Sequence, residues 1–383
     1  MNPVEGDRLE LTVGPVAHGG HCVARHDNRV IFVRHALPGE RVVAVVTEER
    51  PTFLRADAVE ILSPSPDRVA PPCPFARPDA CGGCDLQHVA PDAQREWKTA
   101  VVREQLSRLA GLDSEVRVGA LPGGMLGWRT RVRYAVSLDG AAGLLKHRSH
   151  EVVPIDFCRI AHPAIQALPV TSRRWSTVDE VAVVAPSVGA AVVVADDVVI
   201  TERAIGRRWT LDARVFWQGH PAAADTFAAA VRSLLAPRAG DRVWDLYGGA
   251  GLFSAALAPL VAPGEVTLVE SSGAAARAAR ENVPGIRVVH SRVDRALHRG
   301  LPGPDLVVLD PPRSGAGSAV VRSIVAAGPR AVAYVSCDPA TFARDVRTFQ
   351  ESGWRLAELR AYDAFPMTHH VECVGLLVDG PRS

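Results

Sequence analysis

Lysine is nearly absent from this sequence of 383 residues. Lys98 and Lys146 are the only two, so 41 of the 43 basic residues are arginine. Arginine suits bidentate contacts with phosphate and stacking on bases, but so uniform a bias is more typical of genomic base composition than of function. The formal net charge of +1 excludes no class of partner.

The sequence also lacks a hydrophobic run long enough to cross a membrane. Its most apolar segment, residues 181–195, is short and is interrupted by Pro186 and Gly189. The first ten residues are polar and no apolar segment follows them, so we expect no signal peptide. We therefore expect a cytoplasmic protein, in which the seven cysteines favour metal binding or catalysis over disulfides.

The chain is too long for one hydrophobic core and predicts two or three domains. Residues 1–62 alternate about five short β-rich runs with glycine and proline turns, which predicts a small OB-like barrel. Residues 18–25 and 32–40 resemble the TRAM domain, an OB-like RNA-binding module. The strand pattern alone leaves a purely structural barrel open as the alternative.

Residues 63–212 form a predicted central α+β domain that begins with a proline-rich linker. Cys73, Cys81 and Cys84 lie close together in it, and the spacing of the last two lets both sulfurs face one ion or cluster. Cys158 is the best candidate for a fourth ligand. Four thiolates fit either a structural zinc or an iron–sulfur cluster, and their spacing does not separate the two.

The central region also carries signs of RNA contact. Apolar residues at helical spacing predict one amphipathic helix over residues 91–112, which can pack on the C-terminal domain. Arg129, Arg131 and Arg133 alternate with apolar residues, which places them on one face of a strand. A second basic cluster at residues 146–150 favours a phosphate-binding surface over a plain solvated face.

From residue 213 to 383 strands alternate with helices, which predicts a mostly parallel α/β sheet. A predicted strand over residues 242–247 runs into the glycine-rich loop 248–251 and then a helix, as at nucleotide-type cofactor sites. Glu270 ends the next strand, where it can accept hydrogen bonds from ribose hydroxyls. With Asp245 before the loop, this domain resembles a class I, Rossmann-like S-adenosylmethionine methyltransferase.

Cys337 is the candidate nucleophile. The apolar run 331–335 predicts a buried strand that Asp338 and Pro339 terminate, so Cys337 lies at the carboxyl end, where a helix begins near Thr341. The partial positive charge of a helix N-terminus favours a thiolate. A single cysteine in such a strand is otherwise more often a packing residue, so its neighbours decide its role.

Several motifs, in order, resemble those of the RNA 5-methyluridine methyltransferase family: residues 216–218, 245–251, Glu270, 310–313, 336–341 and 363–372. The resemblance spans the whole chain. It implies that Cys337 attacks uracil C6 and that Glu372 removes the C5 proton, with His370 available to orient Glu372 and Cys373 as a packing residue. It also implies cofactor contacts from Gln218, Tyr247, Gly249, Gly251, Glu270, Asp294 and Asp310.

The same resemblance implies a [4Fe-4S] cluster on Cys73, Cys81, Cys84 and Cys158, with zinc as the alternative. The barrel and the cysteines resemble the ribosomal RNA members, which favours a uridine of 23S rRNA over one of tRNA, and we expect a monomer. Two other readings are open. One is a cytosine-5 methyltransferase, and the other is a non-catalytic iron–sulfur RNA-binding protein with a vestigial methyltransferase fold.

Overall fold

The computed structural model describes residues 3–380, which form two compact units. The first unit comprises the chain up to Val101, Gly124–Ala182 and Phe365–His370. The second unit comprises Val102–Gly123, Val183–Ala364 and the chain from Val371 onward. The predicted division into three domains remains a proposal. Residues 1–2 of the predicted first domain and residues 381–383 of the predicted third domain lie outside the described residues.

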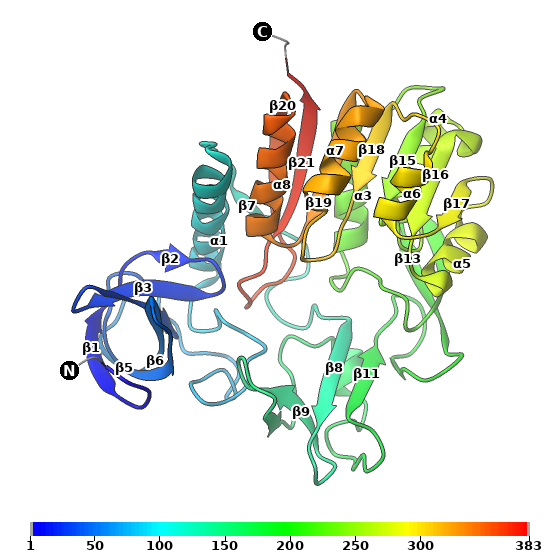
Figure 1. Ribbon diagram of the computed structural model, residues 1–383. Helices are drawn as coiled ribbons and strands as arrows, with labels where there is room; N and C mark the ends of the chain where they lie inside the picture. Colours follow the sequence, from blue (N-terminus) through cyan, green and yellow to red (C-terminus); the bar gives the residue numbers. More distant parts are fainter. Residues whose placement is uncertain (1–2, 381–383) are drawn as a thin grey trace. The chain divides into compact units, whose positions relative to one another are not determined.

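A six-stranded antiparallel and parallel sheet curls into a barrel at the start of the first unit (Figure 1). Its strands are β1 (Arg8–Thr12), β2 (Val16–Ala17), β3 (His21–His26), β4 (Arg29–Arg34), β5 (Arg41–Glu49) and β6 (Phe53–Ser63), in the order β1-β5-β6-β4-β3-β2. Alternate apolar residues such as Leu11, Ile31 and Leu54 point inward and are buried. The five predicted strands are confirmed, and only the short β2 was not anticipated.

The rest of the first unit has little regular structure. Residues 64–90, which carry three of the cysteines, form neither helix nor strand. They are followed later in the chain by the strands β8 (Arg131–Val136), β9 (Ala142–Leu145), β10 (Val152–Pro154) and the start of β11 (Glu180–Val184), and by the short helix α2 (Pro163–Gln166). In this sheet β9 pairs with both β8 and β10.

The predicted helix over residues 91–112 is confirmed. It consists of α1 (Pro91–Gln105) and a π-helical turn, η1 (Leu106–Ala110), and Gly111 ends it in the left-handed conformation that glycine adopts without strain. Trp97 and Val101 belong to the barrel core of the first unit, whereas Val102 and Leu106 belong to the core of the second. One amphipathic helix therefore supplies apolar side chains to both cores.

An eight-stranded sheet forms the centre of the second unit, in the order β17-β16-β15-β18-β19-β21-β20-β7. The strands are β7 (Val118–Ala120), β15 (Val243–Leu246), β16 (Val266–Glu270), β17 (Arg287–His290), β18 (Leu306–Leu309), β19 (Ala331–Ser336), β20 (Trp354–Asp363) and β21 (Glu372–Asp379). β15 to β19 are parallel to their neighbours, and β21 is antiparallel to β19. The central strands β15, β18 and β19 are buried along their whole length and mostly apolar, because helices cover both faces.

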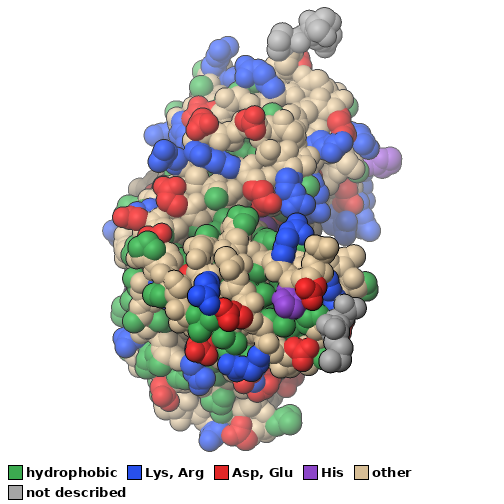
Figure 2. Space-filling view, turned by 90° about the vertical axis from the view of Figure 1, so that its left-hand side faces the viewer, with side chains coloured by type: hydrophobic (Ala, Val, Ile, Leu, Met, Phe, Trp, Pro, Cys, Tyr) green, Lys and Arg blue, Asp and Glu red, His purple; other side chains and the backbone are tan. Residues whose placement is uncertain are grey.

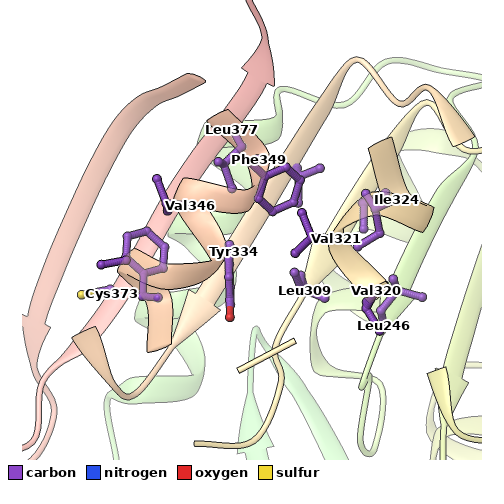
Figure 3. Close-up of a cluster of buried hydrophobic side chains, with 14 of the residues drawn as sticks. Leu246, Leu309, Val320, Val321, Ile324, Tyr334, Val346, Phe349, Cys373 and Leu377 are labelled. Atoms are coloured by element: carbon purple, nitrogen blue, oxygen red, sulfur yellow. The ribbon is translucent and has the colours of Figure 1, made fainter. Parts of the chain in front are cut away.

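Seven helices and turns connect these strands. They are α3 (Ala223–Leu235), α4 (Leu252–Val261) with the 3₁₀ turn η2 (Pro263–Glu265), α5 (Gly273–Asn282), α6 (Val293–Arg299), α7 (Ser318–Ala327) and α8 (Pro339–Glu351). Tyr334 and Cys373 of the sheet pack with Val346 and Phe349 of α8 (Figure 3). The Rossmann-like fold class is thus confirmed, and no helix among the described residues is long and apolar enough to span a membrane.

A two-stranded hairpin, β13 (Val199–Ala204) and β14 (Arg207–Asp212), precedes α3 in the second unit. The short β12 (Val192–Val193) pairs with the last residues of β11. Asn282 at the end of α5 exchanges hydrogen bonds with the backbone of Thr210, which fixes the hairpin beside that helix.

Candidate active site

The carboxyl ends of β15, β16, β18 and β19 share one edge of the sheet, because these strands are parallel. The glycine loop, Glu270, Asp310 and Cys337 each follow or end one of these strands. β21 runs in the opposite direction, so its first residue, Glu372, begins at the same edge. Ligands of open α/β sheets bind at this edge, so the fold itself gathers the predicted site.

The glycine loop makes a tight turn from β15 to α4. Gly249 and Gly251 have φ of 54° and 96°, and Tyr247, although not a glycine, has a φ of 61°. A side chain at Gly248 would come within 2.6 Å of Leu268 Cγ, so this position must stay small. The Gly249 N–H donates to Glu270 Oε2 at 3.0 Å, which ties the loop to the end of β16.

Asp245 lies fully buried beneath the glycine loop. Its Oδ2 accepts hydrogen bonds from the Ser254 N–H at 2.9 Å and from Ser254 Oγ at 2.6 Å. Its Oδ1 is buried and has no hydrogen-bond partner within residues 3–380. Burial raises the pKa of this carboxyl to about 6 despite the two Ser254 bonds. An unpartnered buried oxygen at this position suits a polar or cationic group of a bound ligand, as S-adenosylmethionine has.

Of the other predicted cofactor contacts, Asp294 acts on Tyr247 at the start of the glycine loop. Burial and the nearby Asp294 carboxylate raise the pKa of Tyr247 to about 12. Asp294 itself pairs with Arg292 at 3.0 Å. Gln218 is half-buried in the loop that follows β14, and its role stays a prediction.

Cys337 and Glu372 lie on neighbouring strands. Ser336, the last residue of β19, faces Cys373 of β21 in the antiparallel register, and Cys337 and Glu372 are the next residues on each side. Asp338 caps α8 by accepting the N–H groups of Ala340 at 3.0 Å and Thr341 at 2.8 Å. The predicted strand end and helix start are confirmed, with the helix beginning two residues earlier, at Pro339.

Burial opposes the thiolate that the helix N-terminus favours at Cys337. Burial, followed by the charge of Glu372, raises the pKa of the Cys337 thiol to about 12. Burial and Asp310 also raise the pKa of Glu372 well above its usual value, and burial together with Asp245 raises that of Asp310 to about 8. Desolvation therefore outweighs the helix N-terminus at Cys337 and disfavours the charged forms of all three groups.

Arg313 is the cation of this group. It lowers the pKa of both Cys337 and Glu372, although less than burial raises them. In the sequence it was notable only as the residue that follows Asp310 and the two prolines. Its position at the end of β18 was the available signal.

Asp345 is a buried polar residue near the site that the sequence did not predict. This buried residue of α8 accepts hydrogen bonds from Tyr334 Oη at 2.6 Å and from the N–H groups of Ala316 at 2.8 Å and Gly317 at 3.2 Å. It thereby fixes the loop that carries Arg313. An acidic residue on the apolar face of a predicted helix was the only sequence signal for it.

The four predicted metal ligands meet in the first unit. Cys73, Cys81, Cys84 and Cys158 line one cavity, together with Arg129, that contains about 370 Å³ of space not filled by atoms. Burial raises the pKa of Cys81 to about 11 and also raises those of Cys84 and Cys158, with neighbouring thiols adding to the effect. Within residues 3–380, no three cysteine, histidine or carboxylate side chains are arranged around a single ion.

The comparisons with known proteins agree with this geometry. The profile of the TRAM domain matches residues 4–59, and that of the family described as tRNA (Uracil-5-)-methyltransferase matches residues 304–379. An RNA methyltransferase of Streptomyces avermitilis is 46% identical, covering 97% of this chain and 98% of that one. One of Corynebacterium glutamicum is 35% identical, covering 98% and 97%. The chain belongs to the RNA (uracil-5-)-methyltransferase family.

The solved structure of a methyltransferase from Pyrococcus abyssi shares the fold of this RNA methyltransferase. That protein, described as a tRNA (uracil-54, C5)-methyltransferase in complex with S-adenosyl-L-homocysteine, is 23% identical. The alignment has a TM-score of 0.72 and covers 96% of this chain and 99% of that one. The likeness extends over the barrel, the cysteine region and the Rossmann-like sheet.

The predicted row of phosphate-facing arginines in the methyltransferase needs correction. Arg129 lines the cysteine cavity, and the guanidinium Nε and Nη2 of Arg131 are buried. Only Arg133 is well exposed, and it pairs with Glu180 at 3.2 Å. The regular β8 strand begins only at Arg131, so alternation does not extend to Arg129. Cys373, by contrast, is buried in the core, as predicted.

Hydrogen bonds within the first unit hold the segment that precedes Glu372 in the sequence. The N–H groups of Asp85 and Leu86, next to Cys84, donate to the Met367 carbonyl at 3.1 and 3.0 Å. Asp85 Oδ2 lies 2.6 Å from His369 Nδ1. Burial alone would raise the pKa of Asp85, but the bond from His369 and the charges of His369 and Arg34 lower it well below its usual value. The cysteine-bearing segment of the methyltransferase thus anchors residues 365–370, while an orienting role for His370 stays a prediction.

Proposed function

We propose that this methyltransferase transfers the methyl group of S-adenosylmethionine to C5 of a uridine in RNA, with Cys337 as the nucleophile and Glu372 as the base. The observation that carries the proposal is the facing position of these two residues at the sheet edge that also bears the glycine loop. C5 of uracil is a weak nucleophile, so a group must first add to C6. A thiol and a buried carboxyl on adjacent strands supply an addition step and a later proton removal.

The proposed reaction consists of addition to C6, methyl transfer to C5 and elimination. The Cys337 thiol loses its proton to solvent as the uridine binds, and its sulfur forms a bond to C6, which places the electron pair on C5 and O4. The pair on C5 then takes the methyl group, which releases S-adenosylhomocysteine. Glu372, as carboxylate, removes the C5 proton, and the C6–sulfur bond breaks to restore the double bond. A carboxyl whose pKa is raised by burial is a stronger base for that step once it is ionised.

Asp310 and Arg313 complete the site in this proposal. Asp310 is a neutral acid near pH 7, because its pKa is about 8. In that form it can donate a hydrogen bond to the uracil edge or to the cofactor. Arg313 supplies positive charge near the sulfur and the enolate oxygen, which favours the addition step. The target base must leave its stack to be reached from above the ring.

Labelled S-adenosylmethionine and total RNA test the proposal. We expect label in RNA, and nucleoside analysis should recover it as 5-methyluridine. Label in 5-methylcytidine would instead support the cytosine-5 alternative, and no transfer to any RNA would support a non-catalytic RNA-binding protein.

We propose 23S rRNA as the substrate, as the sequence resemblance favours. The second candidate is tRNA, because the Pyrococcus abyssi protein of similar architecture is described as a tRNA enzyme. Mapping 5-methyluridine in rRNA and tRNA from a strain that lacks this protein separates the two. The site that loses its methyl group identifies the substrate.

We propose that the four cysteines bind a [4Fe-4S] cluster. Their common cavity supports a shared metal centre, and the sequence resemblance favours a cluster over the alternative of zinc. Iron and sulfide near four each per chain would agree with the cluster, whereas one zinc without sulfide would contradict it. We further propose that the protein is a monomer, which size-exclusion chromatography with light scattering tests. We also propose a cytoplasmic location.

A further inference from the structure

Arg313 acts on the active site from an exposed position. Its side chain is exposed, whereas Glu372 is buried and Cys337 is partly buried. An exposed arginine is not distinctive in itself, because basic and acidic side chains lie interspersed on the face shown in Figure 2. Exposed arginine side chains have many rotamers, so the effect of Arg313 on one thiol depends on the backbone that carries it.

Four charged groups act most on the Cys337 thiol. Glu372, Asp310 and Asp338 are carboxyls, and each raises the pKa of this thiol. Arg313 is the cation of the four and lowers it. Addition to C6 requires a thiolate, so Arg313 is the group whose position favours that step.

Arg313 lies in a tight turn at the carboxyl edge of the sheet. The Gly315 N–H donates to the Pro312 carbonyl at 2.9 Å, so Arg313 and Ser314 are the two central residues of this turn. Gly315 has a φ of 81°, in the left-handed region that glycine adopts without strain. The turn sets the direction in which the Arg313 side chain leaves the backbone.

Asp345 of α8 holds the chain at the end of this turn. Its Oδ2 accepts the Ala316 N–H at 2.8 Å, and its Oδ1 accepts the Gly317 N–H at 3.2 Å. A Cβ added at Gly315 would come within 2.8 Å of Asp345 Oδ2. The carboxylate therefore fits the turn closely, and the turn has no room to move toward it.

Tyr334 of β19 fixes the Asp345 carboxylate. Its hydroxyl donates to Asp345 Oδ2 at 2.6 Å, and both side chains are buried. The Tyr334 ring packs edge-on against Phe342 of α8, with the ring centroids 5.2 Å apart, in the core shown in Figure 3. Tyr334 also lies three residues before Cys337 in the sequence. A chain of contacts thus runs from the strand that leads to Cys337, through Asp345, to the turn that carries Arg313.

We infer that Asp345 and Tyr334 are positioning residues for the addition step, because they hold the turn that places the charge of Arg313 near Cys337. The inference rests on the proposed function, in which the Cys337 sulfur adds to uracil C6. Both side chains are buried and hydrogen-bonded to each other, so they act through Arg313 and not by contact with the uridine. The alternative is a plain packing role, in which their loss weakens the fold without acting through Arg313.

Alkylation of Cys337 by iodoacetamide in the ligand-free, full-length protein tests the inference. The rate is followed at a series of pH values by mass spectrometry of the peptide that contains Cys337. Asp345→Asn and Tyr334→Phe should each lower the rate at a given pH by roughly threefold to tenfold, the size expected when one partly exposed charge loses its place. Arg313→Ala should lower it by a similar factor. The rate of adduct formation with 5-fluorouridine RNA should fall in the same variants.

Double variants separate the two roles. If Asp345 acts through Arg313, Asp345→Asn combined with Arg313→Ala should react at the rate of Arg313→Ala alone. Tyr334→Phe combined with Arg313→Ala should do the same, and this variant removes a single oxygen, so it decides the question where Asp345→Asn does not fold. Factors that multiply in the double variants would overturn the inference. So would wild-type rates in the single variants.

Val346→Ala is the matched control for a general loss of stability. Val346 follows Asp345 in α8 and is fully buried in the same core. This variant should unfold at lower denaturant concentration and still alkylate Cys337 at the wild-type rate, and a loss of rate equal to that of Asp345→Asn would overturn the inference. Alkylation requires neither RNA nor cofactor. Absence of methyl transfer by the wild type would therefore contradict the proposed function and leave the alkylation result standing.

Discussion

Cys337 and Glu372 are held opposite each other by the antiparallel pairing of β19 and β21. Ser336 of β19 faces Cys373 of β21. Cys337 follows Ser336 and Glu372 precedes Cys373, so these two residues come next in the same register. Residues that are 35 positions apart in the sequence thus lie at one sheet edge. Glu372 is buried and Cys337 is partly buried, and the charge of Glu372 adds to burial in raising the pKa of the Cys337 thiol.

Glu372→Gln should separate addition from elimination. The variant can still attack C6 and accept the methyl group, but the glutamine cannot remove the C5 proton. We expect turnover to fall by about 10² or more, with a methylated RNA–protein complex that persists on a denaturing gel. Glu358→Gln, an exposed glutamate of β20, is the control and should turn over normally. Normal release of 5-methyluridine by Glu372→Gln would exclude this residue as the base.

The stability of the ligand-free protein should fall as the pH rises from about 4 to about 8. Asp310 has a folded pKa of about 8, whereas an unfolded aspartate titrates near pH 4. Between these values the unfolded chain is ionised and the folded one retains its proton, so unfolding becomes easier with increasing pH. In Asp310→Asn the free energy of unfolding should change by a few kcal/mol less between about pH 4 and about pH 8 than it does in the wild type. Chemical denaturation at several pH values measures this difference. An unchanged pH profile would mean that Asp310 is ionised in the folded protein.

Asp245→Asn should weaken cofactor binding more than it weakens folding. The unpartnered Oδ1 is available to a ligand, and an amide nitrogen in its place would be a donor instead of an acceptor. We expect the Kd for S-adenosylmethionine to rise by roughly 10- to 100-fold, equivalent to about 1–3 kcal/mol, in calorimetric titration. Asp241→Asn, which lies before β15 and pairs with Arg330, tests for a general loss of stability. A Kd equal to that of the wild type would remove Asp245 from the cofactor site.

Cys158→Ser should abolish the visible absorption and the iron content of the purified protein. It should also destabilise the first unit, because the other three cysteines would then lose the metal centre whose binding stabilises the fold. Cys22→Ala, a buried cysteine of the barrel whose Sγ lies 3.5 Å from the Ala36 carbonyl oxygen, is the matched control and should retain both. Full absorption in Cys158→Ser would assign the fourth ligand to another residue.

The sequence predicted the helices and strands better than the pKa values and hydrogen-bond partners of the site residues. Strand alternation placed the barrel, and apolar spacing placed the helix that ends at Gly111, because both depend on local pattern. The raised pKa of Cys337 could not be predicted, since it depends on burial by residues far along the chain. The same holds for Asp345, whose partners Tyr334, Ala316 and Gly317 come from other elements. Arg129 was misassigned because alternation does not show where regular pairing begins.

The most direct test of the account is the covalent bond between Cys337 and uracil C6. Wild-type protein, S-adenosylmethionine and 5-fluorouridine RNA should give a stable complex, since fluorine at C5 cannot be removed as a proton. Peptide mapping should place the RNA on Cys337. Cys337→Ala should bind S-adenosylmethionine with wild-type affinity and form no complex, whereas Cys373→Ala should still form it. A complex retained in Cys337→Ala, or mapped to another residue, would contradict the account.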